Sequence, residues 1–125
     1  MHEETRNWIS RANKDLMTAG FAFHSIDGLL PVTTALHCQQ SAEKFLKAFL
    51  QEHGIRFSSQ HYLRPLLESC ISLDPSFETL RAQINQLDGY SIASRYPNAE
   101  NSIEFRNEAL NAAKQVKEFI LGKLE

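Results

Sequence analysis

The strongest constraint in this sequence is the spacing of its apolar residues, which recur at steps of three and four along most of the chain. That spacing places apolar side chains on one face of an α-helix. Residues 3–26 are a clear example, and the residues on the shared face are Trp8, Ala12, Leu16, Ala19, Phe23 and Ile26. No stretch alternates apolar and polar residues as a half-buried strand does, and no hairpin turn joins two such stretches. The sequence therefore predicts an all-α protein.

Proline and glycine mark the ends of the next two helices. A second helix is expected to run from Pro31, or from the threonines just after it, to His53, with Gly54 as its C-terminal cap. A short third helix follows a connector over residues 55–60. It has Pro65 in its first turn, where a missing N–H is tolerated.

Capping patterns also mark the last two helices. Asp74 and Pro75 are typical of an N-cap followed by the first helical residue, and Gly89 is expected to end or weaken the helix that they begin. Asn101 with Glu104 resembles a capping box at the start of the last helix. Five helical segments joined by short connectors predict an antiparallel up-and-down bundle of four or five helices. The length of 125 residues suits one domain, expected to span residues 1–125.

Composition limits what this domain can bind. The net charge of −2 gives no overall positive field, so any nucleotide or RNA site must be local. The five histidines are scattered and the chain has no glycine-rich phosphate loop, so we expect neither a metal nor another cofactor. Cys38 and Cys70 lie among apolar neighbours and are expected to be buried, reduced thiols. Without a secretory leader or a membrane-spanning apolar run, the protein is expected to be cytoplasmic, with no membrane partner.

A polar stripe on the second helix is the first candidate site. Such a stripe is ordinarily the solvated face of an amphipathic helix, and the alternative is a face turned toward a cavity or a second subunit. Lys44 and Lys47 lie three residues apart and share a face, so their ammonium groups could together hold a phosphate. The stripe consists of His37, Gln40, Lys44, Lys47 and Gln51.

The segment over residues 91–98 is the second candidate site, because it combines a guanidinium, a phenol and a proline just before a helix start. Arg95 offers a planar fork for phosphate, and Tyr96 offers a ring on which a base can stack. In the alternative interpretation, Arg95 pairs with a carboxylate such as Asp88 or Glu100, and Tyr96 packs over the end of the bundle.

These residues resemble the HEPN domain, a helical domain named for nucleotide binding in higher eukaryotes and prokaryotes. The resemblance covers most of the chain and rests on four motifs that occur in the family's order. They are Trp8-Ile9 with Ala12, Asp15-Leu16 and Ala19; residues 37–50, with the core Gln-Gln-x-x-Glu-Lys-x-x-Lys; His61-Tyr62-Leu63 with Leu66-Leu67; and Tyr90 with Ser94-Arg95-Tyr96-Pro97.

The resemblance implies a symmetric homodimer, with the Arg-Tyr-Pro region and the polar side of the second helix near a shared cleft. It also implies nucleotide or RNA binding. Many members are metal-independent ribonucleases, often the toxin of a toxin–antitoxin pair whose other half is a minimal nucleotidyltransferase. Other members bind nucleotides without evident catalysis. The ribonucleases carry an Arg followed a few residues later by a His.

This chain departs from the ribonuclease pattern, because no His occurs in the six residues that follow Arg95. Asn101 ends that window, and an amide cannot take a proton as an imidazole does. If the chain is a ribonuclease, Arg95 stabilises charge at the scissile phosphate and Asn101 or His61 replaces the missing His. Whether the protein is an enzyme is therefore left open.

Our leading hypothesis is a nucleotide- or RNA-phosphate-binding bundle that acts with a minimal nucleotidyltransferase. Its expected binding residues are Lys44, Lys47, Arg95 and Tyr96. The alternatives are a metal-independent endoribonuclease toxin with a degenerate Arg…His motif, and a non-catalytic interaction or dimerisation module.

Overall fold

The computed structural model describes residues 1–23, 31–57, 62–93 and 103–125, with the side chains at 22–23, 31–33, 89–93 and 103–106 outside the description. These residues form helices and no strand, which confirms the all-α prediction. The elements are α1 (Glu3–Phe23), α2 (Pro31–Glu52), α3 (Leu63–Leu73), the 3-10 helix η1 (Pro75–Leu80), α4 (Arg81–Ala93) and α5 (Ile103–Leu124).

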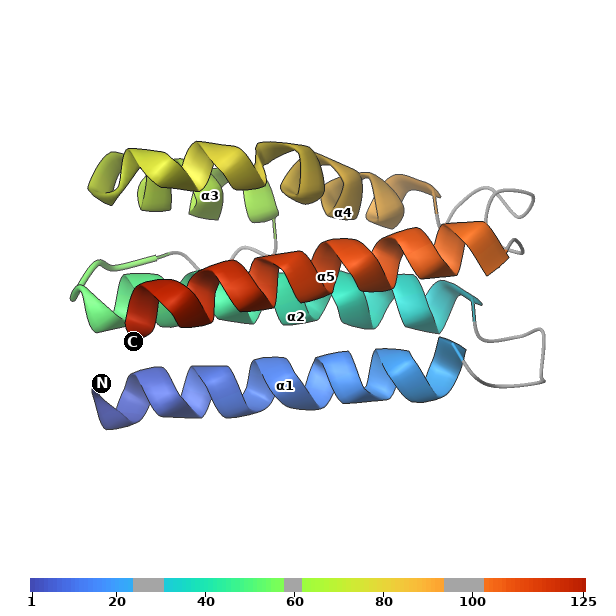
Figure 1. Cartoon of the computed structure of the whole chain (residues 1–125), viewed down its shortest axis with the longest axis horizontal. Helices are drawn as coiled ribbons and strands as arrows, with labels where there is room; N and C mark the ends of the chain where they lie inside the picture. The colour runs from blue at the N-terminus through green and yellow to red at the C-terminus, as the bar shows by residue number, and fades with distance from the viewer. Residues whose placement is uncertain (24–30, 58–61, 94–102) are drawn as a thin grey trace.

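Helix α2 is the centre of the bundle, and α1, α3, α4 and α5 all contact it (Figure 1). Helices α1 and α2 run antiparallel, and α5 runs beside α2 in the same direction as α2 (Figure 1). The two chain termini lie at one end of the bundle. The last residues of α1 and α4 and the first residues of α2 and α5 lie at the other end (Figure 1).

The core forms around α2 because most of its described side chains are buried. Phe77 of η1 joins two neighbours, with its ring centroid 4.4 Å from that of Phe49 in α2 and 4.9 Å from that of Phe119 in α5. Small residues let α1 approach α2 closely, and the Ser41 hydroxyl donates a hydrogen bond of 2.9 Å to the backbone carbonyl of Ala12. This close contact fixes the position of α1 along the axis of α2.

Two of the capping predictions are confirmed. Gly54 has a φ of +69°, the left-handed conformation that lets the chain leave the end of α2 at little cost. The Asp74 carboxylate accepts the backbone N–H of Ser76 at 3.0 Å, with Pro75 as the next residue, and it pairs with Lys123 of α5 at 2.9 Å. Hydrogen bonds from Ser76 and then Lys123 lower the pKa of Asp74 to about 2. The Asp74 side chain therefore caps η1 and also joins it to α5.

The expectation that Gly89 ends the fourth helix is wrong, because α4 continues through it to Ala93. The alternative, that Gly89 weakens the helix, stays a prediction. A single glycine costs a helix only about 1 kcal/mol relative to alanine. Tertiary packing outweighs that cost here, since Ile84 and Leu87 of the same helix are fully buried. The same segment also starts differently from the prediction, with a 3-10 helix before the α-helix begins at Arg81.

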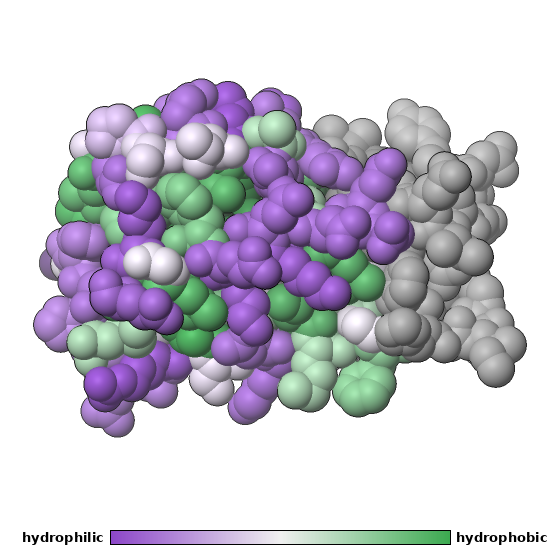
Figure 2. All heavy atoms as spheres, viewed as in Figure 1, coloured by the Kyte–Doolittle hydropathy of each residue, from purple (hydrophilic) through white to green (hydrophobic). Residues whose placement is uncertain are grey.

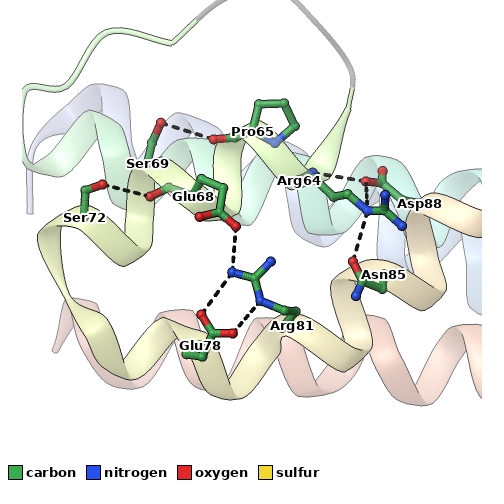
Figure 3. Close-up of polar contacts among 9 residues, drawn as sticks. All are labelled: Arg64, Pro65, Glu68, Ser69, Ser72, Glu78, Arg81, Asn85 and Asp88. Carbon is green, nitrogen blue, oxygen red and sulfur yellow. Dashed lines mark hydrogen bonds and ion pairs between the residues drawn. The ribbon is translucent and has the colours of Figure 1, made fainter.

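A contact between α3 and α4 was not evident from the sequence (Figure 3). The Asp88 carboxylate of α4 accepts the backbone N–H groups of Leu63 at 2.9 Å and Arg64 at 3.1 Å. These are the first two residues of α3, whose own N-cap makes no side-chain bond. Further along the same pair of helices, Arg81 donates to Glu68 at 2.6 Å and also pairs with Glu78 (Figure 3). Helix α3 is therefore capped by a side chain of α4.

Both cysteines are free and buried, as predicted. Burial raises the pKa of Cys38 and of Cys70 to about 12, because a thiolate would be poorly solvated there. Among the described residues, no helix is both long and apolar enough to cross a membrane.

Candidate functional site on the seam between α1 and α2

The polar stripe of α2 packs along α1, so the expectation that it is a solvated face is wrong. Lys47 is 5% exposed, and the other four members of the stripe are half-buried. Gln51 donates a hydrogen bond of 2.7 Å to Glu4 of α1. We call this contact the α1/α2 seam and define it by Asp15, His37, Glu43, Lys44 and Lys47.

Asp15 is the centre of the first cluster in the seam. Its Oδ1 lies 3.2 Å from Nδ1 of His37, and its Oδ2 accepts a hydrogen bond from the Lys44 ammonium. The Asp15 side chain is 12% exposed, whereas those of His37 and Lys44 are 27% and 21% exposed. One carboxylate of α1 therefore holds an imidazole and an ammonium of α2, and solvent still reaches both.

Glu43 and Lys47 form the second cluster, one turn apart on α2. Their charged atoms are 2.9 Å apart, and each side chain is only 6% exposed. The Lys47 ammonium also lies 5.4 Å from the ring centroid of Trp8 and 5.6 Å from that of Phe57. These two rings meet edge to face at 5.6 Å. A buried ion pair flanked by two aromatic rings therefore joins α1, α2 and the following connector.

The structure gives different surroundings to the two lysines predicted to bind phosphate. Each one has a carboxylate partner, Asp15 for Lys44 and Glu43 for Lys47. Because Lys47 is buried and Lys44 is only half-buried, Lys44 is the one that solvent reaches more readily. Their role in phosphate binding stays a prediction. The remaining predicted site residues lie outside the described residues, and they are His61, Arg95, Tyr96 and Asn101.

Asp15 is a site residue whose charged role the local sequence pattern did not predict. The signal was present, because Asp15 lies three residues after Ala12 and four before Ala19, on the face assigned to the core. A carboxylate on a core-facing stripe requires a partner. The position of Asp15 therefore indicates a cationic or imidazole partner on a neighbouring helix, as His37 and Lys44 are.

The opposite side of the bundle carries a shallow hollow between α4 and α5, in a region where hydrophilic side chains dominate the surface (Figure 2). The amides of Gln83 and Gln115 are 2.6 Å apart across it, and Gln86 approaches Glu108 at 3.4 Å. These contacts join α4 to α5. Within the described part of the chain, no group of three acidic, His or Cys side chains could hold a metal ion.

The fold is a helical bundle with α2 at its centre. In the seam, the Lys44 ammonium and the His37 imidazole of α2 contact the Asp15 carboxylate of α1. The family model of the HEPN domain matches residues 5–124. The chain therefore belongs to the HEPN family, which supports a role related to nucleotides or RNA. Comparison with curated proteins and with solved structures found no match.

Proposed function

We propose that this protein binds a nucleotide or the phosphates of RNA as a homodimer, and that it acts with a minimal nucleotidyltransferase in a toxin–antitoxin-like pair. The observation that carries the proposal is the sequence Ser94-Arg95-Tyr96-Pro97 between α4 and α5 of a HEPN chain. A guanidinium forms bidentate hydrogen bonds with phosphate, and a phenol ring stacks on a base. Arg95 and Tyr96 are the principal binding residues in this proposal.

Lys44 is the described residue that best fits a supporting role in binding. Its side chain is 21% exposed, whereas that of Lys47 is 6% exposed. A ligand in solvent therefore reaches the Lys44 ammonium more readily and can share it with the Asp15 carboxylate. Lys47 can reach a ligand only if its buried pair with Glu43 opens, so its contribution is the smaller of the two.

The test is a titration of the purified protein with labelled RNA and with a nucleoside triphosphate. Replacing Arg95 by Ala removes a charge-assisted hydrogen bond worth about 1.5–3 kcal/mol, so affinity falls by roughly tenfold or more. Arg6→Ala is the matched control, because Arg6 is an exposed arginine whose side chain bonds to no described residue. Equal affinities for the wild type and Arg95→Ala would contradict the proposal.

The homodimer and the partner have separate tests. Sedimentation of the purified protein is expected to give twice the chain mass of 14.3 kDa, and a monomer at micromolar concentration would contradict the dimer. A neighbouring reading frame with a Gly-Ser…Asp-x-Asp pattern, whose product co-purifies with this chain, is expected for the paired system. Absence of such a frame would argue against the toxin–antitoxin role and leave the binding function standing.

A metal-independent endoribonuclease is the second candidate, and one observation favours it. The seam holds an imidazole against a carboxylate, which is an arrangement used in proton transfer. Asn101 and His61 also stay predictions for that role. If Arg95→Ala and Lys44→Ala change neither ligand binding nor RNA integrity, the third hypothesis, a non-catalytic interaction module, is favoured instead.

A further inference from the structure

The outward side of α1 carries an exposed aromatic ring and two exposed cations. We propose that these residues, Arg11, Lys14 and Phe21, form a track along α1 that binds single-stranded RNA. The inference rests on the proposed RNA binding and adds a second contact surface to it, on a different helix from the segment that contains Arg95. It also makes an extended strand, and not a mononucleotide, the preferred ligand.

Phe21 supplies the aromatic part of the α1 track. It is the most exposed large apolar side chain among the described residues, at 74%, and Met17, one turn earlier, is 63% exposed. Apolar side chains lie at the surface near the last turns of α1, beside hydrophilic ones (Figure 2). An aromatic ring left in water contributes little to folding, whereas any RNA base can stack on it, because every base has a π face. Phe21 therefore offers a platform for one base.

Arg11 and Lys14 supply the cationic part of the α1 track. The Arg11 guanidinium lies 4.5 Å from the ring centroid of Trp8. This stacked position leaves the arginine less conformational freedom to lose when it binds a ligand. Among the described residues, no carboxylate pairs with Arg11 or with Lys14. Both cations are therefore available to phosphate oxygens.

The three residues lie along one side of α1. At about 100° of rotation for each residue, they fall within about 80° of one another around the helix axis. Lys14 is about 4.5 Å and Phe21 about 15 Å from Arg11 along that axis. A ligand that contacts all three side chains is therefore longer than one nucleotide, as a single strand of RNA is.

Local charge also favours RNA on this helix, although the chain as a whole carries −2. Residues 5–21 contain three basic side chains and one acidic side chain. The acidic one is Asp15, which is 12% exposed and already paired with Lys44. Helix α1 packs mainly on α2 and lies at the edge of the bundle, so no other described helix covers its outward side (Figure 1). An RNA backbone therefore meets a positive local field there.

The α1 track ends close to the proposed binding segment. Phe21 lies two residues before the end of α1, at the end of the bundle where α4 ends and α5 begins (Figure 1). The segment that contains Arg95 and Tyr96 joins those two helices. A strand with one phosphate on Arg95 therefore continues onto Phe21 and then along α1 toward Lys14 and Arg11.

The experiment titrates the full chain with a labelled oligouridylate of about eight nucleotides and, separately, with uridine triphosphate, each at several salt concentrations. We expect Phe21→Ala to weaken oligouridylate binding by about 5- to 100-fold, the usual effect of removing one stacking ring, without changing the salt dependence. We expect Arg11→Ala and Lys14→Ala each to weaken it and to reduce the slope of log affinity against log salt concentration by about 0.7, because each removes one phosphate contact. The affinity for uridine triphosphate is expected to stay unchanged in all three variants.

Further variants separate stacking from a general apolar contact. Phe21→Trp is expected to retain oligouridylate affinity, whereas Phe21→Leu, which keeps an apolar side chain but no ring, is expected to lose it. Tyr62→Ala and Arg6→Ala are the matched controls, because they remove an exposed aromatic ring and an exposed arginine outside the α1 track. All of these side chains are exposed, so the variants are expected to stay folded.

The outcomes distinguish this inference from the proposed function. Wild-type oligouridylate affinity in Phe21→Ala and Lys14→Ala, with binding lost in Arg95→Ala, would overturn the inference and leave the proposed function standing. Absence of binding of either ligand by the wild type would overturn both. If Phe21→Ala sediments at half the mass of the wild type and binds RNA as tightly for each chain, this side of α1 contacts a second copy of the chain, and the inference is again overturned.

Discussion

Replacing Lys47 by Met tests whether the buried ion pair in the seam supports the fold. Methionine keeps the length of the side chain and the contacts of its stem, but it leaves the Glu43 carboxylate without the ammonium at 2.9 Å. Both side chains are 6% exposed, so water cannot replace the lost partner. We therefore expect Lys47→Met to destabilise the protein.

The magnitude follows from the burial of the pair. Removing one partner of a buried ion pair typically costs about 3–5 kcal/mol, because the interior solvates the remaining charge poorly. Loss of the cation–π contact with Trp8 and Phe57 contributes about 0.5–1 kcal/mol more. At roughly 4 °C for each kcal/mol in a domain of this size, the melting temperature is expected to fall by roughly 14–24 °C.

The assay is urea unfolding followed by circular dichroism, with Lys44→Met as the matched control. Lys44 is the partly exposed lysine of the same seam, and its partner Asp15 keeps the contact with His37, so the control is expected to cost less than Lys47→Met. Adding Glu43→Gln to Lys47→Met replaces the buried carboxylate by a neutral amide and is expected to recover part of the loss. If Lys47→Met changed the free energy of unfolding by less than about 1 kcal/mol, the structural role of the pair would be refuted.

Three further predictions concern stability and reactivity. The pKa of Asp74 is lowered from 3.8 to about 2, so its contribution to stability is full above pH 3.8 and is lost as the pH falls toward 2. Acid unfolding of Asp74→Asn should lack that loss. Identical acid unfolding profiles of the wild type and the variant would contradict the role of Asp74 as a cap. With thiol pKa values of about 12, Cys38 and Cys70 should resist a thiol reagent at pH 8 until urea unfolds the protein, and fast labelling of the native protein would contradict their burial. Gly54→Ala should destabilise the protein by about 1 kcal/mol, because the φ of Gly54 is positive. Gly20→Ala should stabilise it by about 0.5–1 kcal/mol, because Gly20 lies within α1 and a methyl group there meets open space. Urea unfolding of both variants checks these opposite signs.

The helices were predictable because their signals are local. Apolar spacing defines the faces, and the caps at Gly54 and Asp74 lie where the sequence places them. The continuation of α4 past Gly89 was not predictable, because buried side chains elsewhere in the helix outweigh a local preference. The cap that Asp88 supplies to α3 was not predictable either, since it joins residues 24 and 25 positions apart.

The candidate site was only partly predictable, for a related reason. The stripe on α2 was evident as a pattern, but its partner depends on how α1 packs against it. Asp15 lies 22 residues before His37, and nothing in local periodicity connects the two. A polar stripe has the same sequence pattern whether it faces water or a carboxylate on a neighbouring helix. The packing of the helices therefore decides which of the two environments it has. The same contact also showed that Lys44 and Lys47, which look equivalent in sequence, differ in burial.

The most direct test of the central claim is sedimentation of the wild type and Arg95→Ala with a fluorescently labelled single-stranded RNA. The account predicts that the wild type carries the RNA in a complex containing two protein chains, that added salt weakens this complex, and that Arg95→Ala leaves most of the RNA free. RNA that sediments alone with both proteins, or equally bound RNA with both, would contradict the claim that this HEPN protein binds RNA phosphate through Arg95.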